Sequence, residues 1–412
     1  MRMCRSTRLG VAMMAVLAGV TPGSAATFSS SSTGSLGAFA PSSNTTVVLP
    51  ADGILNYTTV SIPAGVTVTF QRNSANTPVT MLATGDVNIA GTIDVSGQNA
   101  VLSVGSTPAP GGLGGPGGFS GGMSGSWSNS NFNGTAGQGP GGGRASIRDP
   151  FFTTSDSGTY GGPSDFVSLL PLFGGSGGGG AAQQVNVFAN MYSGGGGGGG
   201  VVIASTTQIT VQSTGTITAN GGAGNVPNCD WRAAGAGSGG AIRLVAPKLT
   251  NLGTIQATGG SPGCPGAGGA GRIRLESFVT GVVNATTPAA SVSNAPGPVT
   301  SASVPALVNL PTLVISTIGG QTVPSNPGGS YATADVTLPP GTTNPVTVTV
   351  TATNTTVPTT FSFKVLPPNA AAPIPVTATS TGSFASSTAT ASLTIPAGQT
   401  SVLQVYGDYM LP

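Results

Sequence analysis

The sequence predicts an all-β protein: a parallel β-solenoid that carries a long glycine-rich insertion and is followed by a small β-sandwich. Short segments that alternate apolar and polar residues recur along the chain, with glycine clusters between them. This period of two is typical of strands that bury one face of a sheet. The chain also holds 68 glycines and 33 prolines among 412 residues, and no apolar stripe with a helical period extends beyond its N-terminal segment. Both observations disfavour helices.

Residues 1–26 have the pattern of a cleavable secretory signal. Arg2, Arg5 and Arg8 precede the apolar residues 9–20, and Ser24-Ala25-Ala26 supplies small residues at a cleavage site. Twelve residues rise about 18 Å as a helix, too little to cross a hydrocarbon core of about 30 Å. We therefore expect an exported protein, extracellular or on the cell surface, with the periplasm as an alternative, and no membrane-spanning segment in the mature chain.

The charge of the mature chain excludes some partners. Removal of the signal takes away three of the twelve basic residues and none of the ten acidic ones, which leaves a net charge near −1. Charged residues make up only 5% of the chain, against about 25% in ordinary soluble domains. Nucleic-acid binding requires a basic face. The composition therefore predicts no nucleic-acid partner.

Internal repeats carry the solenoid prediction. Related units span residues 79–97, 198–224 and 238–263, and residues 269–278 begin another. Three sets of positions are interpreted as equivalent: Val202, Ile242 and Ile273; Ala204, Leu244 and Leu275; and Ile93, Ile217 and Ile255, each preceded by a Gly-Thr pair that suits a tight corner. Such short strands cannot bury an apolar face alone, but stacked units do.

This repeat style resembles the parallel β-helix of pectin-lyase-like folds and of glycine-rich exported bacterial surface proteins. The resemblance covers roughly residues 45–280 and lies in the repeat pattern, without a signature motif. It implies a β-helix domain over residues 27–280, interrupted by an insertion at about 98–197.

The insertion allows three interpretations. It contains glycine-rich stretches at 111–143, 174–180 and 194–200 and holds 10 of the 22 aromatic residues. It is a flexible loop whose aromatic side chains cap the solenoid, or a binding loop. In a third interpretation the glycine runs pack as polyproline-II strands, because only glycine lets such backbones approach closely. The candidate binding residues here are Trp127, Phe151, Phe152, Tyr160 and Tyr192.

The C-terminal part changes in composition. Residues 281–305 are rich in Pro, Ala, Ser and Thr, which predicts a linker. Within 306–412, seven short strands are expected at 312–316, 330–338, 346–353, 360–366, 374–378, 387–395 and 401–406. Regular turn signals between them favour an immunoglobulin-like β-sandwich. The likeness is architectural, because no cysteine pair or core tryptophan supports a true immunoglobulin domain.

Catalytic chemistry finds little support. The chain has no histidine, which removes the common triads and the usual zinc sites. Asp86 and Asp94 share one repeat, where turn and strand roles explain them. Asp149, Asp156 and Asp165 match no calcium-binding spacing. We expect a protein that is not an enzyme and that has no catalytic residues, metal or cofactor.

Two pairs of residues remain as candidates. Arg243 and Arg274 fall on equivalent strand positions and are expected to point outward, where they either hold an anionic sugar or form a solvated face. Cys229 and Cys264 fall in equivalent glycine-rich loops of an exported chain, which predicts a disulfide; two free thiols are the alternative.

The favoured function is therefore a non-catalytic exported structural or adhesion protein of the cell surface or extracellular space. Its expected partner is a surface glycan or another envelope or matrix protein. The alternative is a polysaccharide-binding or polysaccharide-lyase-like β-helix protein. Ice binding is a third class; threonine is abundant, but no regular Thr-x-Thr spacing from coil to coil is visible in the sequence.

Overall fold

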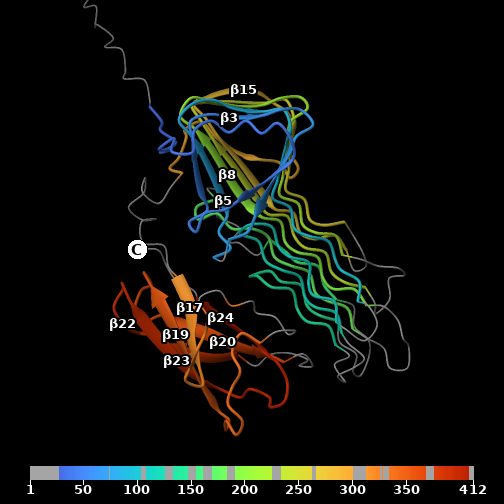
Figure 1. Ribbon diagram of the computed structural model, residues 1–412, viewed down its shortest axis with the longest axis vertical. Coiled ribbons are helices and arrows are strands. Elements are labelled where there is room, and N and C mark those ends of the chain that lie inside the picture. The colour runs from blue at the N-terminus through green and yellow to red at the C-terminus, as the bar shows by residue number, and fades with distance from the viewer. Residues whose placement is uncertain are drawn as a thin grey trace, which may run out of the picture.

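The computed structural model describes residues 27–407 except 74, 104–107, 126–132, 147–154, 161–168, 183–190, 225–232, 262–265, 300–311, 325–326, 328–333 and 368–374. This part of the chain contains strands and no helix, which confirms the all-β prediction. A parallel solenoid, a glycine-rich bundle and an antiparallel C-terminal domain make up the described chain (Figure 1).

The solenoid consists of three parallel sheets, to which each coil adds one strand in turn. The first sheet contains β2 (Ile54–Tyr57), β5 (Val79–Ala83), β8 (Gly200–Ser205), β11 (Ala241–Val245), β14 (Arg272–Glu276) and β16 (Ser291–Ser293). The second contains β3 (Val60–Ile62), β6 (Val87–Ile89), β9 (Gln208–Val211), β12 (Lys248–Asn251) and β15 (Val279–Val283). The third contains β1 (Thr45–Val48), β4 (Thr67–Gln71), β7 (Thr92–Asp94), β10 (Thr216–Thr218) and β13 (Thr254–Gln256).

An apolar core fills the interior of the coils. Ile93, Ile217 and Ile255 occupy one register position on neighbouring strands and are at most 1% exposed. Each fully buried side chain of this size contributes roughly 1.5–3 kcal/mol. The ladder predicted at these positions is confirmed, and it explains why strands of three residues persist.

The predicted register is wrong by one residue at β8. Val201 and Ile203, not Val202 and Ala204, lie beside Ile242 and Leu244. A shift of one residue moves a side chain to the opposite face. Val202 and Ala204 therefore point outward and pack in a second apolar cluster with Leu82, Val245 and Val299. Every residue of β8 is buried, so the alternation that fixes register elsewhere is absent there.

The insertion joins later loops in what we call the glycine bundle. Its described segments are 95–103, 108–117, 118–125, 133–138, 141–146, 155–160, 174–182, 191–199, 219–224, 233–240, 257–261 and 266–271. They run side by side away from the solenoid (Figure 1, teal to yellow-green). Most of them are joined by backbone hydrogen bonds without forming strands.

The bonds of residues 193–199 repeat every three residues. Their N–H groups donate in strict rotation to segments 95–103, 118–125 and 233–240. The carbonyls of residues 194–198 accept in rotation from 108–117, 174–182 and 219–224, and the carbonyl of Gly199 accepts from Ala241 at the start of β11. Three residues per turn is the period of polyproline II. A Cβ on Gly194 would lie 1.9 Å from the Gly178 carbonyl oxygen. Of the three interpretations, the described residues support polyproline-II packing, and for them the flexible loop is wrong.

The solenoid continues beyond its predicted end at residue 280. Strand β15 pairs with β12, and β16 pairs with β14. The linker predicted at 281–305 therefore begins later than expected, because residues 291–293 still form a strand. Its Pro, Ala and Ser content concealed this edge strand, which buries little apolar surface of its own.

The C-terminal domain has two antiparallel sheets, ordered β18-β17-β19-β23-β22 and β21-β20-β24. Their bounds are Thr312–Ile318 (β17), Gln321–Thr322 (β18), Val346–Thr353 (β19), Thr360–Leu366 (β20), Pro375–Thr379 (β21), Thr381–Gly382 (β22), Ser387–Leu393 (β23) and Val402–Gly407 (β24). Phe361 and Phe363 lie in the core between the sheets. The strand predicted at 330–338 is not formed by residues 334–338, and its first part lies outside the described residues.

Candidate functional site

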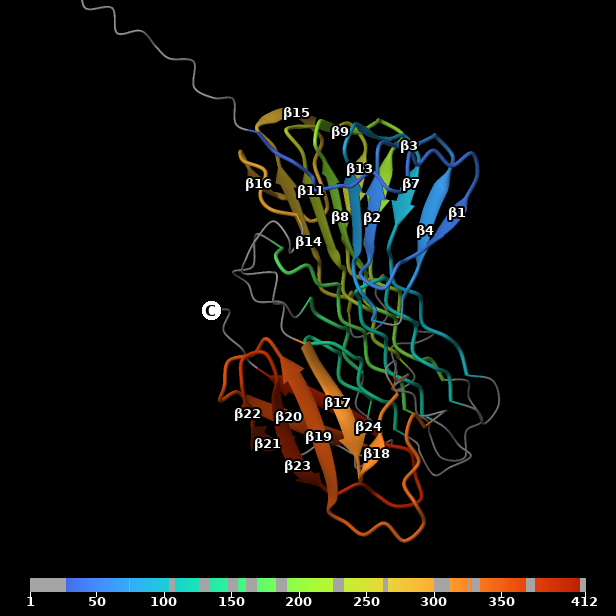
Figure 2. The same ribbon diagram turned by 60° about the vertical axis from the view of Figure 1, so that its left-hand side comes forward.

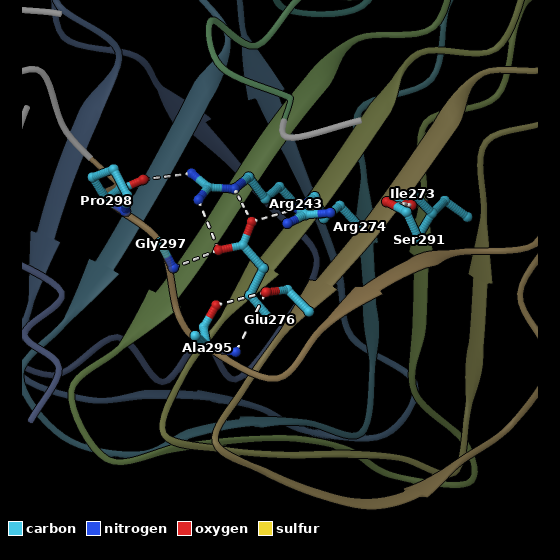
Figure 3. A network of polar contacts seen from close by, with 9 residues as sticks. Arg243, Ile273, Arg274, Glu276, Ser291, Ala295, Gly297 and Pro298 are labelled. Carbon is cyan, nitrogen blue, oxygen red and sulfur yellow. Dashed lines mark hydrogen bonds and ion pairs between the residues drawn. The ribbon is translucent and has the colours of Figure 1, made fainter. Parts of the chain in front are cut away.

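The two candidate arginines belong to a buried ion-pair cluster on the outer side of the first sheet. Arg243 and Arg274 are register partners, as expected. Glu276 lies two residues beyond Arg274 on the same strand and binds both (Figure 3): Nε and Nη2 of Arg243 donate over 3.0 and 2.9 Å, and Nε of Arg274 donates over 2.7 Å. The Gly297 amide donates to Oε2 over 2.6 Å, and Nη1 of Arg243 donates to the Pro298 carbonyl over 2.7 Å.

The expectation that both arginines face solvent is wrong for Arg243, which is 0% exposed. Residues 297–299 cover it, and Val299 packs in the apolar cluster on the same side of the sheet. Sequence reasoning missed this cover because Pro298 contacts Arg243, which lies 55 positions earlier in the chain. No local pattern predicts a contact over that separation. An anion from solvent would have to displace this segment and compete with a carboxylate that is already bound.

Electrostatics hold Glu276 ionised. Burial is the largest single influence and would raise the pKa of Glu276, but the hydrogen bonds and charge of Arg243, aided by Arg274 and the Gly297 amide, lower the pKa overall. The Glu276 carboxylate is already hydrogen-bonded by two guanidinium groups and one amide, and removing one partner of such a buried pair leaves an uncompensated charge. We therefore interpret the cluster as structural. The cluster links β11, β14 and the covering segment 297–299 by hydrogen bonds and ion pairs.

Tyr160 has a structural environment too. Its hydroxyl donates to the Phe173 carbonyl over 3.1 Å, and the Arg272 guanidinium lies 5.3 Å from its ring centre. Burial raises the pKa of Tyr160 to about 12. A cavity of about 300 Å³ adjoins it, lined also by Leu169 and Pro288.

Among the described residues, no contact joins Tyr160 to another of the candidate aromatic residues. Half-buried Tyr192 pairs through its backbone with Leu102 on the far part of the bundle. Trp127, Phe151 and Phe152 lie outside the described residues, as do Cys229 and Cys264. The aromatic binding loop and the disulfide therefore stay predictions.

A surface that sequence reasoning missed lies on the outer side of the third sheet, and we call it the threonine face. One row contains Thr67, Thr92, Thr216 and Thr254 on β4, β7, β10 and β13. The next row contains Thr46, Thr69, Asp94, Thr218 and Gln256. Figure 2 shows β1, β4 and β7 side by side in this sheet. As the sequence indicates, Thr-x-Thr itself does not recur on every coil, since only β4 and β10 carry it; the regular feature is the single row of threonines.

The threonine face is open and nearly neutral. Thr46 and Thr254 are exposed, and the other members are half-buried. Its one charged member, Asp94, accepts hydrogen bonds from Thr218 Oγ1 at 2.8 Å and from the Ser96 amide at 2.9 Å. A signal was present in the sequence: the Gly-Thr-Ile corners supply three of the four members of the first row, Thr92, Thr216 and Thr254.

The C-terminal domain contains an apolar groove. Its volume is about 900 Å³, and apolar side chains line it, among them Ile315, Ile318, Leu338, Leu403 and Val405. It lies beside β24, which pairs with β20 on one edge and with no described strand on the other. The groove holds no cluster of titratable groups; Asp335 is the one charged residue in its lining.

No metal-binding group of three His, Cys, Asp or Glu residues occurs within the described ranges. The same part of the chain contains no helix that is long and apolar enough to cross a membrane. No protein-family model matches the chain, and comparison with curated proteins and with solved structures finds no match.

Proposed function

We propose that this chain is a non-catalytic exported protein of the cell surface or extracellular space, in which the solenoid and glycine bundle form a stiff frame for adhesion or assembly. The observation that carries this proposal is the hydrogen bonding of residues 193–199, whose consecutive N–H groups each have a partner in a neighbouring segment. A frame held by backbone bonds needs few charges, in keeping with a chain in which 5% of residues are charged.

The proposal takes a glycan or another matrix protein as the partner. The apolar groove of the C-terminal domain is a described surface that offers contact area for such a partner. The polysaccharide-lyase alternative is weaker, because Glu276 already binds Arg243 and Arg274. That alternative requires basic residues other than this pair.

Export is tested by expressing the full chain with a C-terminal tag in a Gram-negative host. We expect the tagged protein outside the cytoplasm with Thr27 as its first residue. A matched variant that lacks residues 2–26 should remain in the cytoplasm. Recovery of the full chain from the cytoplasm with its N-terminus intact would contradict export.

The absence of catalysis is tested with the same purified protein. We expect retention on some members of a glycan array and no release of unsaturated or reducing ends from acidic polysaccharides. Turnover in proportion to enzyme concentration would overturn the proposal in favour of the lyase alternative. No retention on any glycan would direct the search to protein partners.

A further inference from the structure

We propose that the threonine face binds ice, that is, a neutral and periodic lattice of water. The inference goes beyond the structural role proposed above and does not depend on export. It rests on the register of the third sheet, where four consecutive strands place threonine at one outward position and three of five strands place it two residues further on.

The first step is periodicity. Neighbouring strands are about 4.8 Å apart, and positions i and i+2 of a strand are about 6.7 Å apart, so the rows form a two-dimensional array. A surface that repeats one hydroxyl group at regular intervals can match a partner whose own hydrogen-bonding groups repeat at the same intervals, as they do in ice. The oxygen atoms of hexagonal ice repeat along one axis at a spacing close to that between strands.

The second step is charge. Apart from Asp94 the nine members of the face are neutral, and Asp94 is already bound by Thr218 and Ser96. An uncharged hydroxyl surface complements an uncharged hydrogen-bonding lattice. It does not complement an anionic polysaccharide, and it lacks the arginine and aromatic side chains on which protein interfaces depend.

The third step is rigidity. Threonine is β-branched, which restricts its first side-chain torsion. The backbone beneath each residue is held by parallel strand pairing on both sides at β4, β7 and β10. The hydroxyls of Thr46 and Thr69 also lie 2.9 Å apart and order each other. A stiff array loses little conformational freedom when it orders water, so little free energy opposes the contact.

Two other faces of the solenoid contrast with this one. The outer face of the first sheet is covered by an apolar cluster and by residues 297–299. On the second sheet the comparable row is mixed, with Ser61, Asn88, Thr210 and Thr250. The neighbouring row of that sheet carries Lys248 beside Gln208. Only the third sheet presents uniform threonine over four strands.

The test measures thermal hysteresis and the habit of single ice crystals with the purified mature chain. We expect a freezing gap and faceted crystals. The double variant Thr92→Lys/Thr216→Lys should abolish both, because two long cations on adjacent strands prevent flat contact. The variant Thr210→Lys on β9, in the same coil as Thr216, is the matched control and should retain both.

Unchanged circular dichroism and thermal unfolding will show that the variants fold. The double variant Thr92→Val/Thr216→Val provides a second test, because valine has nearly the shape of threonine and leaves the packing intact. We expect this double variant to reduce the freezing gap, because it removes two hydroxyls that hydrogen-bond to the water lattice. No hysteresis in the unaltered protein overturns the proposal, as does equal loss in Thr210→Lys. Full retention in Thr92→Lys/Thr216→Lys overturns it too, and binding of the face to a glycan in place of ice assigns the rows to that partner.

Discussion

Replacing Gly197 by alanine tests whether close backbone packing holds the glycine bundle together. A Cβ added to Gly197 would lie 2.0 Å from the carbonyl oxygen and 2.2 Å from the carbonyl carbon of Gly175. Both obstacles are backbone atoms, so no side-chain rotation can relieve the clash. Segment 174–182 would have to move, although its N–H groups bond to segments on several sides.

The expected magnitude follows from these distances. Overpacking a well-filled interior typically costs 1–3 kcal/mol, and more where the surroundings cannot shift. We therefore expect Gly197→Ala to lower the free energy of unfolding by about 3 kcal/mol or more. Gly200 is the matched control in the same glycine run, because the nearest atom to its added Cβ is the Leu172 side-chain tip at 3.1 Å. Gly200→Ala should stay within about 1 kcal/mol of the original protein, since alanine also reduces the entropy of the unfolded chain.

Denaturant unfolding followed by circular dichroism measures both variants, and hydrogen exchange shows where stability is lost. For Gly197→Ala we expect a lower midpoint and faster exchange at amides of the bundle. If Gly197→Ala and Gly200→Ala unfold at the same denaturant concentration, the close packing inferred for residues 193–199 is wrong.

The remaining predictions concern the ion-pair cluster, Tyr160, the sandwich core and the cysteines. Glu276→Gln should cost about 3–5 kcal/mol, because it leaves Arg243 buried without its charge partner. Since folding lowers the pKa of Glu276, its contribution should be lost as the pH falls below its ordinary value of 4.5, and the variant should lose this dependence. Ultraviolet titration should show Tyr160 ionising near pH 12, with its contribution to stability lost as the pH rises from 10 towards 12; ionisation near 10 would contradict its burial. Phe361→Ala should cost about 3–5 kcal/mol and act on the C-terminal domain, so a calorimetric transition of the solenoid that shifts equally would refute separate cores. Thiol titration of the unfolded mature protein without reductant should find no free thiol, because Cys229 and Cys264 are predicted to form a disulfide; two reactive thiols would rule the disulfide out.

Local sequence patterns were sufficient to predict most strands of the solenoid and the face that each buries. Alternation with a period of two and the Gly-Thr-Ile corners place Ile93, Ile217 and Ile255 in one buried ladder, because each strand carries its own signal for which face is inside. Strand β8 lacks that signal. Its residues are buried on both faces, so only pairing with β5 and β11 decides its register.

By itself, the sequence determined the all-β class, the stacked repeats, the low charge and the absence of histidine, because these depend on composition and on neighbours along the chain. Tertiary structure alone decided the rest. Residues 297–299 bury Arg243, and glycine segments pack around 193–199. Thr92 on β7 and Thr216 on β10, far apart in the sequence, become register partners. These contacts depend on which distant segments lie next to each other in the fold. A local sequence pattern does not specify which segment will cover Arg243, pack against a glycine backbone or place a second threonine beside the first.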